Sequence, residues 1–190
     1  MKKANVLLLA MAIISLLVLS ACTPPSRGHQ VGVSGNSVAQ QSEAIVGINK
    51  GNLPPDFTIT TIDGKQLNLR EFKNENRPVL LYFWASWCPY CSRDFDIVKN
   101  IYPKYADKVA FLAIDLDTNE KADLINNYKT RKNLQGIDFA EGKESILSDY
   151  GITHTTTKYA IGKDGTILYK GSGVFNEQQW EVLLSGLANS

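Results

Sequence analysis

The chain has 190 residues, 44% of them apolar and 21% charged, which is enough for one packed domain and excludes global disorder. Its 20 basic and 19 acidic residues give a formal charge of +1, so no field of one sign exists to gather nucleic acid. Three cysteines are too few for a small disulfide-stapled protein, and the odd number leaves one of them without a partner.

The first 21 residues have the features of an export signal. Lys2 and Lys3 precede an apolar run over residues 6–19, and small residues follow it. The run of about 14 residues is short for a membrane span, which needs roughly 20. The alternative is an uncleaved N-terminal anchor helix. Both interpretations place the rest of the chain outside the cytoplasm.

Residues 22–52 are predicted to be a flexible tether, because proline, glycine and serine dominate and apolar residues are few. His29 lies in this segment and is expected to be solvated. The sequence Leu19-Ser20-Ala21-Cys22 resembles the lipobox of bacterial lipoproteins. That resemblance implies that the signal is cleaved before Cys22 and that Cys22 carries the lipid anchor, stable when two or more acyl chains are attached. It also accounts for the unpaired cysteine.

The predicted folded part, residues 53–190, begins with a strand pattern. Alternating apolar and polar residues around Asp63-Gly64 predict a β-hairpin over residues 56–69. The apolar run 78–84 is typical of a strand covered on both faces. Apolar residues at helical spacing over 89–102 predict a helix that ends or kinks at Pro103.

The second half alternates between strand and helix patterns. Strands are predicted at 109–114, 137–139, 157–161 and 166–169. One helix is predicted to follow an N-cap at Thr118, with Leu124, Ile125 and Tyr128 facing inward. A short helix is predicted over 143–150, ending at Gly151, and a final helix after a capping box of Asn176 and Gln179. This order implies an α/β domain with a mixed central sheet. Trp180 and most tyrosines are expected in the core.

Cys88 and Cys91 lie where a buried strand passes into a helix. Unpaired backbone N–H groups and the helix dipole favour a thiolate at a helix N-terminus, and the thiolate is the attacking species in disulfide exchange. Pro89 suits the first helical position. Cys91 is expected one turn along, more shielded, and able to resolve a mixed disulfide. The alternatives are a structural disulfide, which in so tight a loop contributes little, and a zinc site, which lacks a second Cys-x-x-Cys.

The segment from Phe83 to Cys91 resembles the active-site strand and turn of the thioredoxin superfamily, and residues 51–69 resemble the N-terminal extension of its TlpA/ResA-type subgroup. The resemblance implies a thioredoxin-like α/β fold with an N-terminal β-hairpin extension. It further implies a membrane-tethered, extracytoplasmic thiol–disulfide oxidoreductase; several members serve cytochrome c maturation. Protein dithiols or disulfides are the implied substrates, with an electron-donating membrane protein as partner of a reductase. No organic cofactor is implied.

Three positions depart from the family pattern in or near the helix that carries the cysteines. Tyr82 stands where thioredoxins carry a buried Asp, and its reference pKa near 10 makes it a poor proton relay at neutral pH. Asp94 stands where the TlpA/ResA-type proteins place a Glu, and it is expected to accept a proton from Cys91 through a water. The alternative is a surface Asp favoured by the helix dipole. Asp96 replaces a helix-kinking proline, so a straighter helix is expected.

Thr156 occupies the position of the family's cis-proline. The Thr155–Thr156 bond is therefore expected either to keep a strained cis geometry or to relax to trans and reshape the substrate groove. If the alignment holds, Thr156 lies close to Cys88. The residues expected to shape the peptide-binding surface are Trp87, Pro89, Tyr90, Thr155 and Thr156.

His154 is expected beside the two cysteines by the same alignment. Two thiolates and an imidazole are a plausible copper or zinc ligand set, so the alternative function is a copper-binding or metal-delivery lipoprotein that uses Cys88, Cys91 and His154. His154 could instead line the groove or stabilise the Cys88 thiolate. A peroxide-reducing enzyme is a third hypothesis, which the Cys-Pro-Tyr-Cys arrangement disfavours. The sequence does not determine the direction of electron flow.

Overall fold

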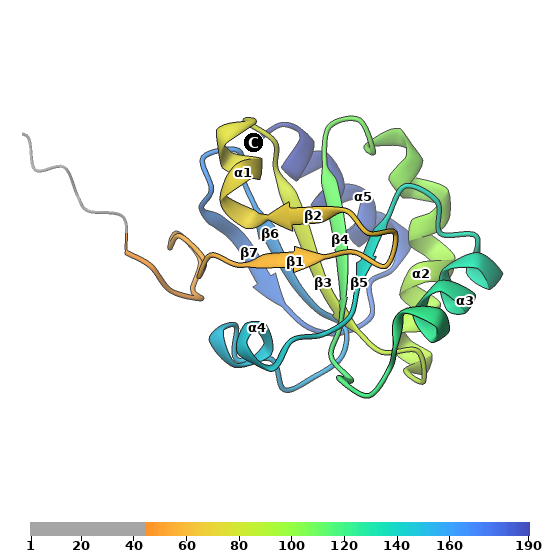
Figure 1. Cartoon of the computed structure of the whole chain (residues 1–190). Helices are drawn as coiled ribbons and strands as arrows, with labels where there is room; N and C mark the ends of the chain where they lie inside the picture. The colour runs from red at the N-terminus through yellow and green to blue at the C-terminus, as the bar shows by residue number, and fades with distance from the viewer. Residues whose placement is uncertain (1–44) are drawn as a thin grey trace, which may run out of the picture. The chain divides into compact units, whose positions relative to one another are not determined.

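The computed structural model describes residues 45–190, which form a five-stranded mixed sheet with an additional two-stranded hairpin (Figure 1). The sheet order is β5-β4-β3-β6-β7; β3, β4 and β5 are parallel, whereas β6 runs antiparallel to β3 and β7 antiparallel to β6. The strands are β1 (Thr58–Thr60), β2 (Gln66–Asn68), β3 (Val79–Trp84), β4 (Ala110–Asp115), β5 (Asp138–Ala140), β6 (Thr157–Ile161) and β7 (Ile167–Gly171).

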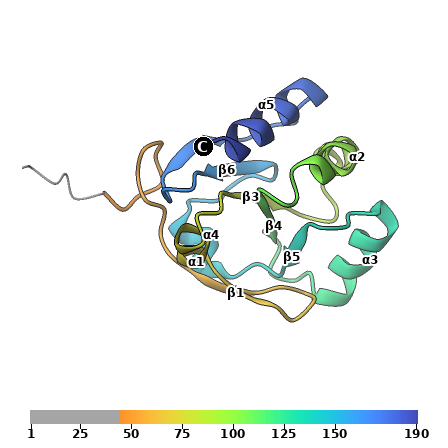
Figure 2. The same ribbon diagram turned by 90° about the horizontal axis from the view of Figure 1, so that it is seen from above.

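Helices and the hairpin cover the two faces of the sheet (Figure 2). One face packs against α2, α3 and α5, and the other packs against the β1–β2 hairpin, α1 and α4. The helices are α1 (Leu69–Asn74), α2 (Pro89–Ile101), α3 (Ala122–Lys132), α4 (Glu144–Asp149) and α5 (Glu177–Ala188), and a 3₁₀ turn, Tyr102–Lys104, follows α2 at Pro103.

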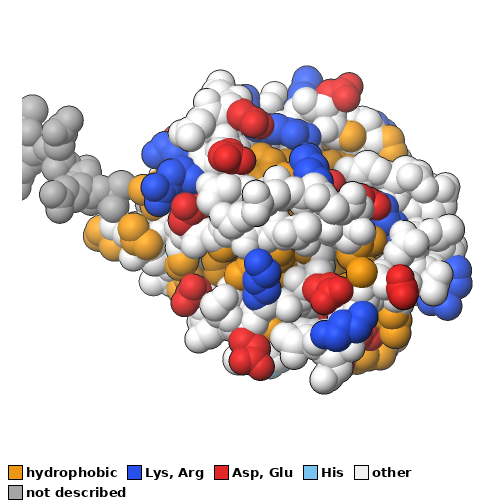
Figure 3. Space-filling model, in the orientation of Figure 1, with side chains coloured by type: hydrophobic (Ala, Val, Ile, Leu, Met, Phe, Trp, Pro, Cys, Tyr) orange, Lys and Arg blue, Asp and Glu red, His pale blue; other side chains and the backbone are white. Residues whose placement is uncertain are grey.

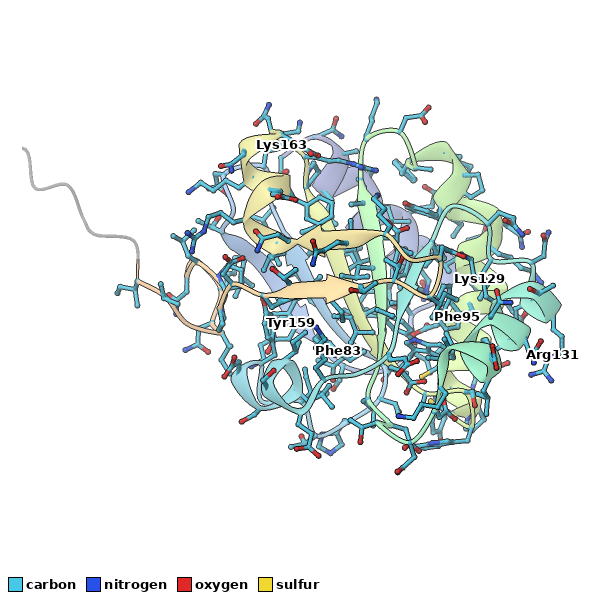
Figure 4. The ribbon with its side chains drawn as sticks, in the orientation of Figure 1. Phe83, Phe95, Lys129, Arg131, Tyr159 and Lys163 are labelled. Atoms are coloured by element: carbon cyan, nitrogen blue, oxygen red, sulfur yellow. The ribbon has the colours of Figure 1, made fainter. Side chains whose placement is uncertain are left out.

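The central strand β3 contributes to both cores. All six of its residues are buried, as expected of a strand with no solvent face. Because side chains alternate along a strand, Tyr82 and Trp84 belong to the core shared with α2 and α5, whereas Phe83 belongs to the core beneath the hairpin. Figure 4 shows Phe83 beside Tyr159 of β6, with Phe95 on the side of α2.

Most predicted elements are confirmed, and the start of α3 is not. The capping box of Asn176 and Gln179 is present at α5. The prediction that Thr118 caps α3 is wrong: the helix begins at Ala122, whose backbone N–H donates to Glu141 Oε1 at 2.8 Å. A carboxylate distant in sequence thus replaces the local cap. Leu124, expected inward, is 45% exposed.

Residues 45–52 of the predicted tether are described by the structure, and two of them contact the sheet. The backbone N–H of Gly51 donates to Ile167 O at 2.8 Å, and the N–H of Ile167 donates to Asn52 O at 2.9 Å, so this segment is attached to β7. The predicted signal peptide (1–21), Cys22, His29 and the tether up to residue 44 lie outside the described residues.

The described part of the chain contains no helix long and apolar enough to cross a membrane. Its charged side chains of both signs are interspersed on the face that carries β1 and β2 (Figure 3). This distribution agrees with the near-neutral composition.

Candidate active site

Three loops meet at one end of the central sheet. The registers place the carboxyl ends of β3 and β4 side by side, with Trp84 opposite Asp115, and place the amino end of β6 next to β3, with Phe83 opposite Thr157. The cysteine pair follows β3, an acidic loop follows β4, and the segment with the threonines precedes β6. The topology therefore brings the predicted cysteine pair and threonine segment together, and adds the acidic loop to them.

Cys88 is the N-cap residue of α2, as predicted. Its sulfur accepts a hydrogen bond from the backbone N–H of Cys91 at 3.1 Å, and Pro89 occupies the start of the helix, where no N–H is needed. The sulfur therefore receives an N–H that the first helical turn leaves unpaired.

Cys91 lies one turn along α2 and is fully buried. Its thiol donates to the Cys88 sulfur at 2.6 Å, and both cysteines are free. Burial raises the pKa of Cys91 to about 12, the Cys88 thiol adds to the shift, and contacts with the Ala85 backbone and the Tyr82 hydroxyl act in the opposite direction. Cys91 is therefore a protonated thiol at neutral pH. Cys88 itself is only 2% exposed.

The predicted threonine segment lies against the cysteines. The Cys88 thiol donates to Thr155 Oγ1 at 3.2 Å, so Thr155 faces the candidate nucleophile. Thr156 is buried, and its Oγ1 accepts from the backbone N–H of Gly173 at 3.0 Å. Thr156 has φ of 62°, a left-handed conformation that a β-branched residue rarely adopts and that costs about 1–3 kcal/mol. The strain at this position is thus in the backbone torsion of Thr156.

Exposed side chains surround Cys88 on the helix side. Trp87 is 60% exposed and Tyr90 57% exposed, and Pro89 between the cysteines is exposed as well. The Trp87 indole donates from Nε1 to Asp117 Oδ2 at 2.9 Å, which fixes the ring. Apolar groups held open to solvent beside a reactive sulfur are suited to contact with an extended peptide.

The loop after β4 holds the turn before Cys88, and the sequence analysis missed it. Glu120 Oε2 accepts from the Ser86 backbone N–H at 2.9 Å, and its other oxygen accepts from the Ser86 hydroxyl. Asp115 is fully buried, and burial followed by the Glu120 carboxylate raises its pKa to about 9. The sequence carries a signal for this loop, because the carboxylate of Asp115 comes directly after the buried run 109–114.

Asp94 is not the surface residue that the sequence analysis gave as the alternative. The side chain is fully buried, and four donors surround it. They are the Phe175 backbone N–H and Trp180 Nε1 on Oδ1, at 2.8 and 3.2 Å, and the Tyr82 hydroxyl and Lys158 Nζ on Oδ2, each at 2.9 Å. Tyr82 also contacts Cys91, so it lies between the thiol and the carboxylate.

The metal-ligand alternative is not assembled. His154 is exposed, and its Nδ1 lies 2.7 Å from the hydroxyl of its neighbour Thr153. Among residues 45–190, no three His, Cys, Asp or Glu side chains form a group suited to hold a metal ion. Asp96 pairs on the surface with Lys132 at 2.8 Å and Lys99 at 3.3 Å, and α2 remains one helix at this position.

Residues 49–184 match the Redoxin family. The chain belongs to the Redoxin family. Thiol-disulfide oxidoreductase ResA of Bacillus thuringiensis subsp. konkukian (strain 97-27) is 30% identical to this redoxin over 135 residues, which cover 70% of this chain and 76% of the relative. Thioredoxin-like protein YneN of Bacillus subtilis (strain 168) is 29% identical over 157 residues, covering 81% and 90% of the two chains.

Solved structures agree with this assignment. The solution structure of a putative protein disulfide isomerase from Bacteroides thetaiotaomicron superimposes with a TM-score of 0.65 at 25% identity, covering 75% of this redoxin and 92% of that chain. The predicted thioredoxin-like fold and TlpA/ResA-type assignment are confirmed, and this redoxin is a thiol–disulfide oxidoreductase.

Proposed function

We propose that this redoxin exchanges disulfides with protein substrates outside the cytoplasm while held at a membrane by a lipid on Cys22. The observation that carries the exchange chemistry is the position of Cys88. Its sulfur caps α2, and the Cys91 thiol lies against it at 2.6 Å. Trp87, Pro89, Tyr90 and Thr155 contact the substrate around this sulfur, and Thr156 supports Thr155 from beneath.

The proposed reaction conserves atoms and electrons. The Cys88 thiolate attacks one sulfur of a substrate disulfide, a mixed disulfide forms, and the second substrate sulfur leaves as a thiolate and takes up a proton. Cys91 then loses its proton and attacks Cys88. The Cys88–Cys91 disulfide forms, the first substrate sulfur is released, and two electrons have passed from the protein to the substrate. The reverse sequence oxidises a substrate dithiol.

Cys91 needs a proton acceptor for the second step because its pKa is raised to about 12. The Tyr82 hydroxyl contacts Cys91 and donates to Asp94 at 2.9 Å. Asp94 is therefore proposed to take the Tyr82 proton while the Tyr82 hydroxyl takes the proton of Cys91, in place of the water that the sequence analysis expected. Tyr82 stays neutral in this exchange, so its raised pKa does not prevent the transfer. The negative charge of the buried Asp94 carboxylate favours movement of a proton toward it.

The proposed setting follows from the N-terminal sequence and from the TlpA/ResA-type membership. A lipid on Cys22 and the segment that follows it would hold the domain at the outer side of a membrane, where an electron-donating membrane protein can reach it if it acts as a reductase. Cytochrome c maturation is the process that this membership suggests.

Trapping of the mixed disulfide tests the exchange chemistry. In Cys91→Ser, a synthetic peptide with an internal disulfide is expected to stay attached to Cys88, and mass spectrometry would show the adduct. Cys88→Ser is the matched control and is expected to form none. Equal adduct formation in the two variants would contradict the proposal. Loss of radioactive palmitate incorporation in Cys22→Ser tests the anchor separately.

A further inference from the structure

Lys158, the second residue of β6, is a buried cation that the proposed chemistry does not use. Its side chain is fully buried, and Nζ makes three hydrogen bonds, which use all the donors of an ammonium group. The acceptors are Gly173 O at 2.7 Å, Asp94 Oδ2 at 2.9 Å and Thr156 O at 3.1 Å. Rings of Phe175, Tyr82 and Trp180 lie 4.5, 4.9 and 5.1 Å from Nζ.

Stability alone does not account for this ion pair. A buried pair is often no more stable than apolar side chains of similar size, because both charges lose their hydration. Burial lowers the pKa of Lys158 even though Asp94 opposes the shift. The positions of the three acceptors are therefore more informative than the strength of the pair.

One carbonyl acceptor, Thr156 O, belongs to the segment that faces Cys88, and the other, Gly173 O, belongs to the loop after β7 that is bonded to Thr156. Thr156 carries the positive φ of 62°, and its hydroxyl already accepts from the Gly173 N–H. Lys158 joins the same two residues a second time through their carbonyl oxygens. The strained Thr156 is thus held from two sides, and its neighbour Thr155 is kept 3.2 Å from the Cys88 sulfur.

The third acceptor leads to the other cysteine. Asp94 Oδ2 accepts from Lys158 and from Tyr82, and the Tyr82 hydroxyl contacts Cys91. One ammonium group therefore contacts both the loop at Cys88 and the network beneath Cys91.

We propose that Lys158 is a positioning residue for disulfide exchange, whose ammonium group holds the Thr155–Thr156 segment against Cys88 and holds Asp94 and Tyr82 beneath Cys91. This inference rests on the proposed exchange with peptide disulfides. It predicts two separable effects, one on binding of the substrate and one on ionisation of the resolving thiol.

Single-turnover kinetics separate the two effects. Fully reduced protein is mixed with a synthetic peptide that contains a disulfide, and the observed rate is measured against peptide concentration. Asp94→Asn keeps the Lys158 bonds to the two carbonyls, so the half-saturating concentration is expected to stay within twofold of wild type. The double variant Asp94→Asn/Lys158→Met removes both members of the buried pair, so no unpaired charge is left in the core and the fold is expected to be kept. Its half-saturating concentration is expected to be at least fivefold higher than that of wild type.

The pH profile gives the second readout. The titratable groups that face Nζ are Asp94, Cys91 and Cys88 of α2 and Tyr82 of β3. Both Asp94→Asn and the double variant are expected to shift the pH dependence of Cys91 alkylation, whereas only the double variant changes the half-saturating concentration. The matched control is Lys129→Met with Asp63→Asn, an ion pair at 2.7 Å outside the site, which is expected to change neither.

The outcomes distinguish the two proposals. If wild-type protein does not react with the peptide, the proposed function fails. If wild type reacts and the double variant matches Asp94→Asn in half-saturating concentration, the inference about Lys158 is overturned. A fivefold or larger increase confined to the double variant supports it.

Discussion

Asp115 should make the stability of the protein depend on pH. The side chain is fully buried, and Oδ1 accepts from the Asp117 N–H at 2.8 Å. Oδ2 has no donor among the described residues, and the Glu120 carboxylate contributes to the raised pKa. Protonation of Asp115 removes the buried negative charge that burial and the neighbouring carboxylate disfavour. In Asp115→Asn, the amide keeps the acceptor and supplies a permanent donor in place of that proton.

The magnitude follows from the shift. The pKa of Asp115 rises from an ordinary value of 3.8 to about 9 on folding. Because the folded state holds the extra proton, the contribution of this group to stability is complete below pH 4 and is lost as pH rises through 9. The loss is about 1.4 kcal/mol per pH unit, or about 2.7 kcal/mol between pH 5 and pH 7, as an upper bound.

Urea unfolding at pH 5 and pH 7 measures the effect. Between these two conditions the free energy of unfolding of wild type is expected to fall by up to about 2.7 kcal/mol more than that of Asp115→Asn. Asp117→Asn, which removes a half-buried carboxylate of the same loop that contributes least to the raised pKa of Asp115, should keep most of the wild-type slope. Identical slopes for wild type and Asp115→Asn would refute the assignment of this pH dependence to Asp115.

Four further substitutions test the packing and the rim. Gly142→Ala places a Cβ 2.0 Å from Asp115 O, so thermal melting should show a loss of stability of about 1–3 kcal/mol. Gly186→Ala, in open space on α5, should instead raise the stability by about 0.5–1 kcal/mol. A change of the same sign in both variants would contradict this. Phe95→Ala should cost about 3–5 kcal/mol in urea unfolding, because its ring is fully buried among aromatic neighbours; a loss below about 1 kcal/mol would show that the core is not packed as described. Trp87→Phe removes one indole hydrogen bond at the exposed rim, so it should change the stability by less than about 1.5 kcal/mol. It should nevertheless raise the half-saturating peptide concentration. An unchanged concentration would argue against contact of the substrate with Trp87.

Local patterns in the sequence were sufficient for the elements and for the dithiol. The apolar run of β3 identifies a doubly covered strand, and the capping box of Asn176 and Gln179 identifies the start of α5. Cys88 could be placed at a helix N-terminus because Pro89 and helical spacing follow it. Each of these signals lies within a few residues of the feature that it predicts.

Contacts between distant residues could not be predicted in this way. Asp94 and Lys158 are 64 positions apart, and each resembles a surface charge in its local sequence. The pairing of β3 with β6 places Lys158 opposite Tyr82, and the packing of α2 on the same face of the sheet brings Asp94 to both of them. Ser86 likewise depends on Glu120, which is 34 positions away. In these places tertiary packing overrides local preference.

Alkylation of the fully reduced, folded protein at pH 7 tests the central claim most directly. With limiting iodoacetamide and peptide mapping by mass spectrometry, the label is expected on Cys88. Cys91 is expected to remain unmodified because a thiol with a pKa of about 12 is ionised to only about one part in 10⁵ at this pH. Labelling of Cys91 at the same rate, or no label on Cys88, would contradict the assignment of attacking and resolving thiols.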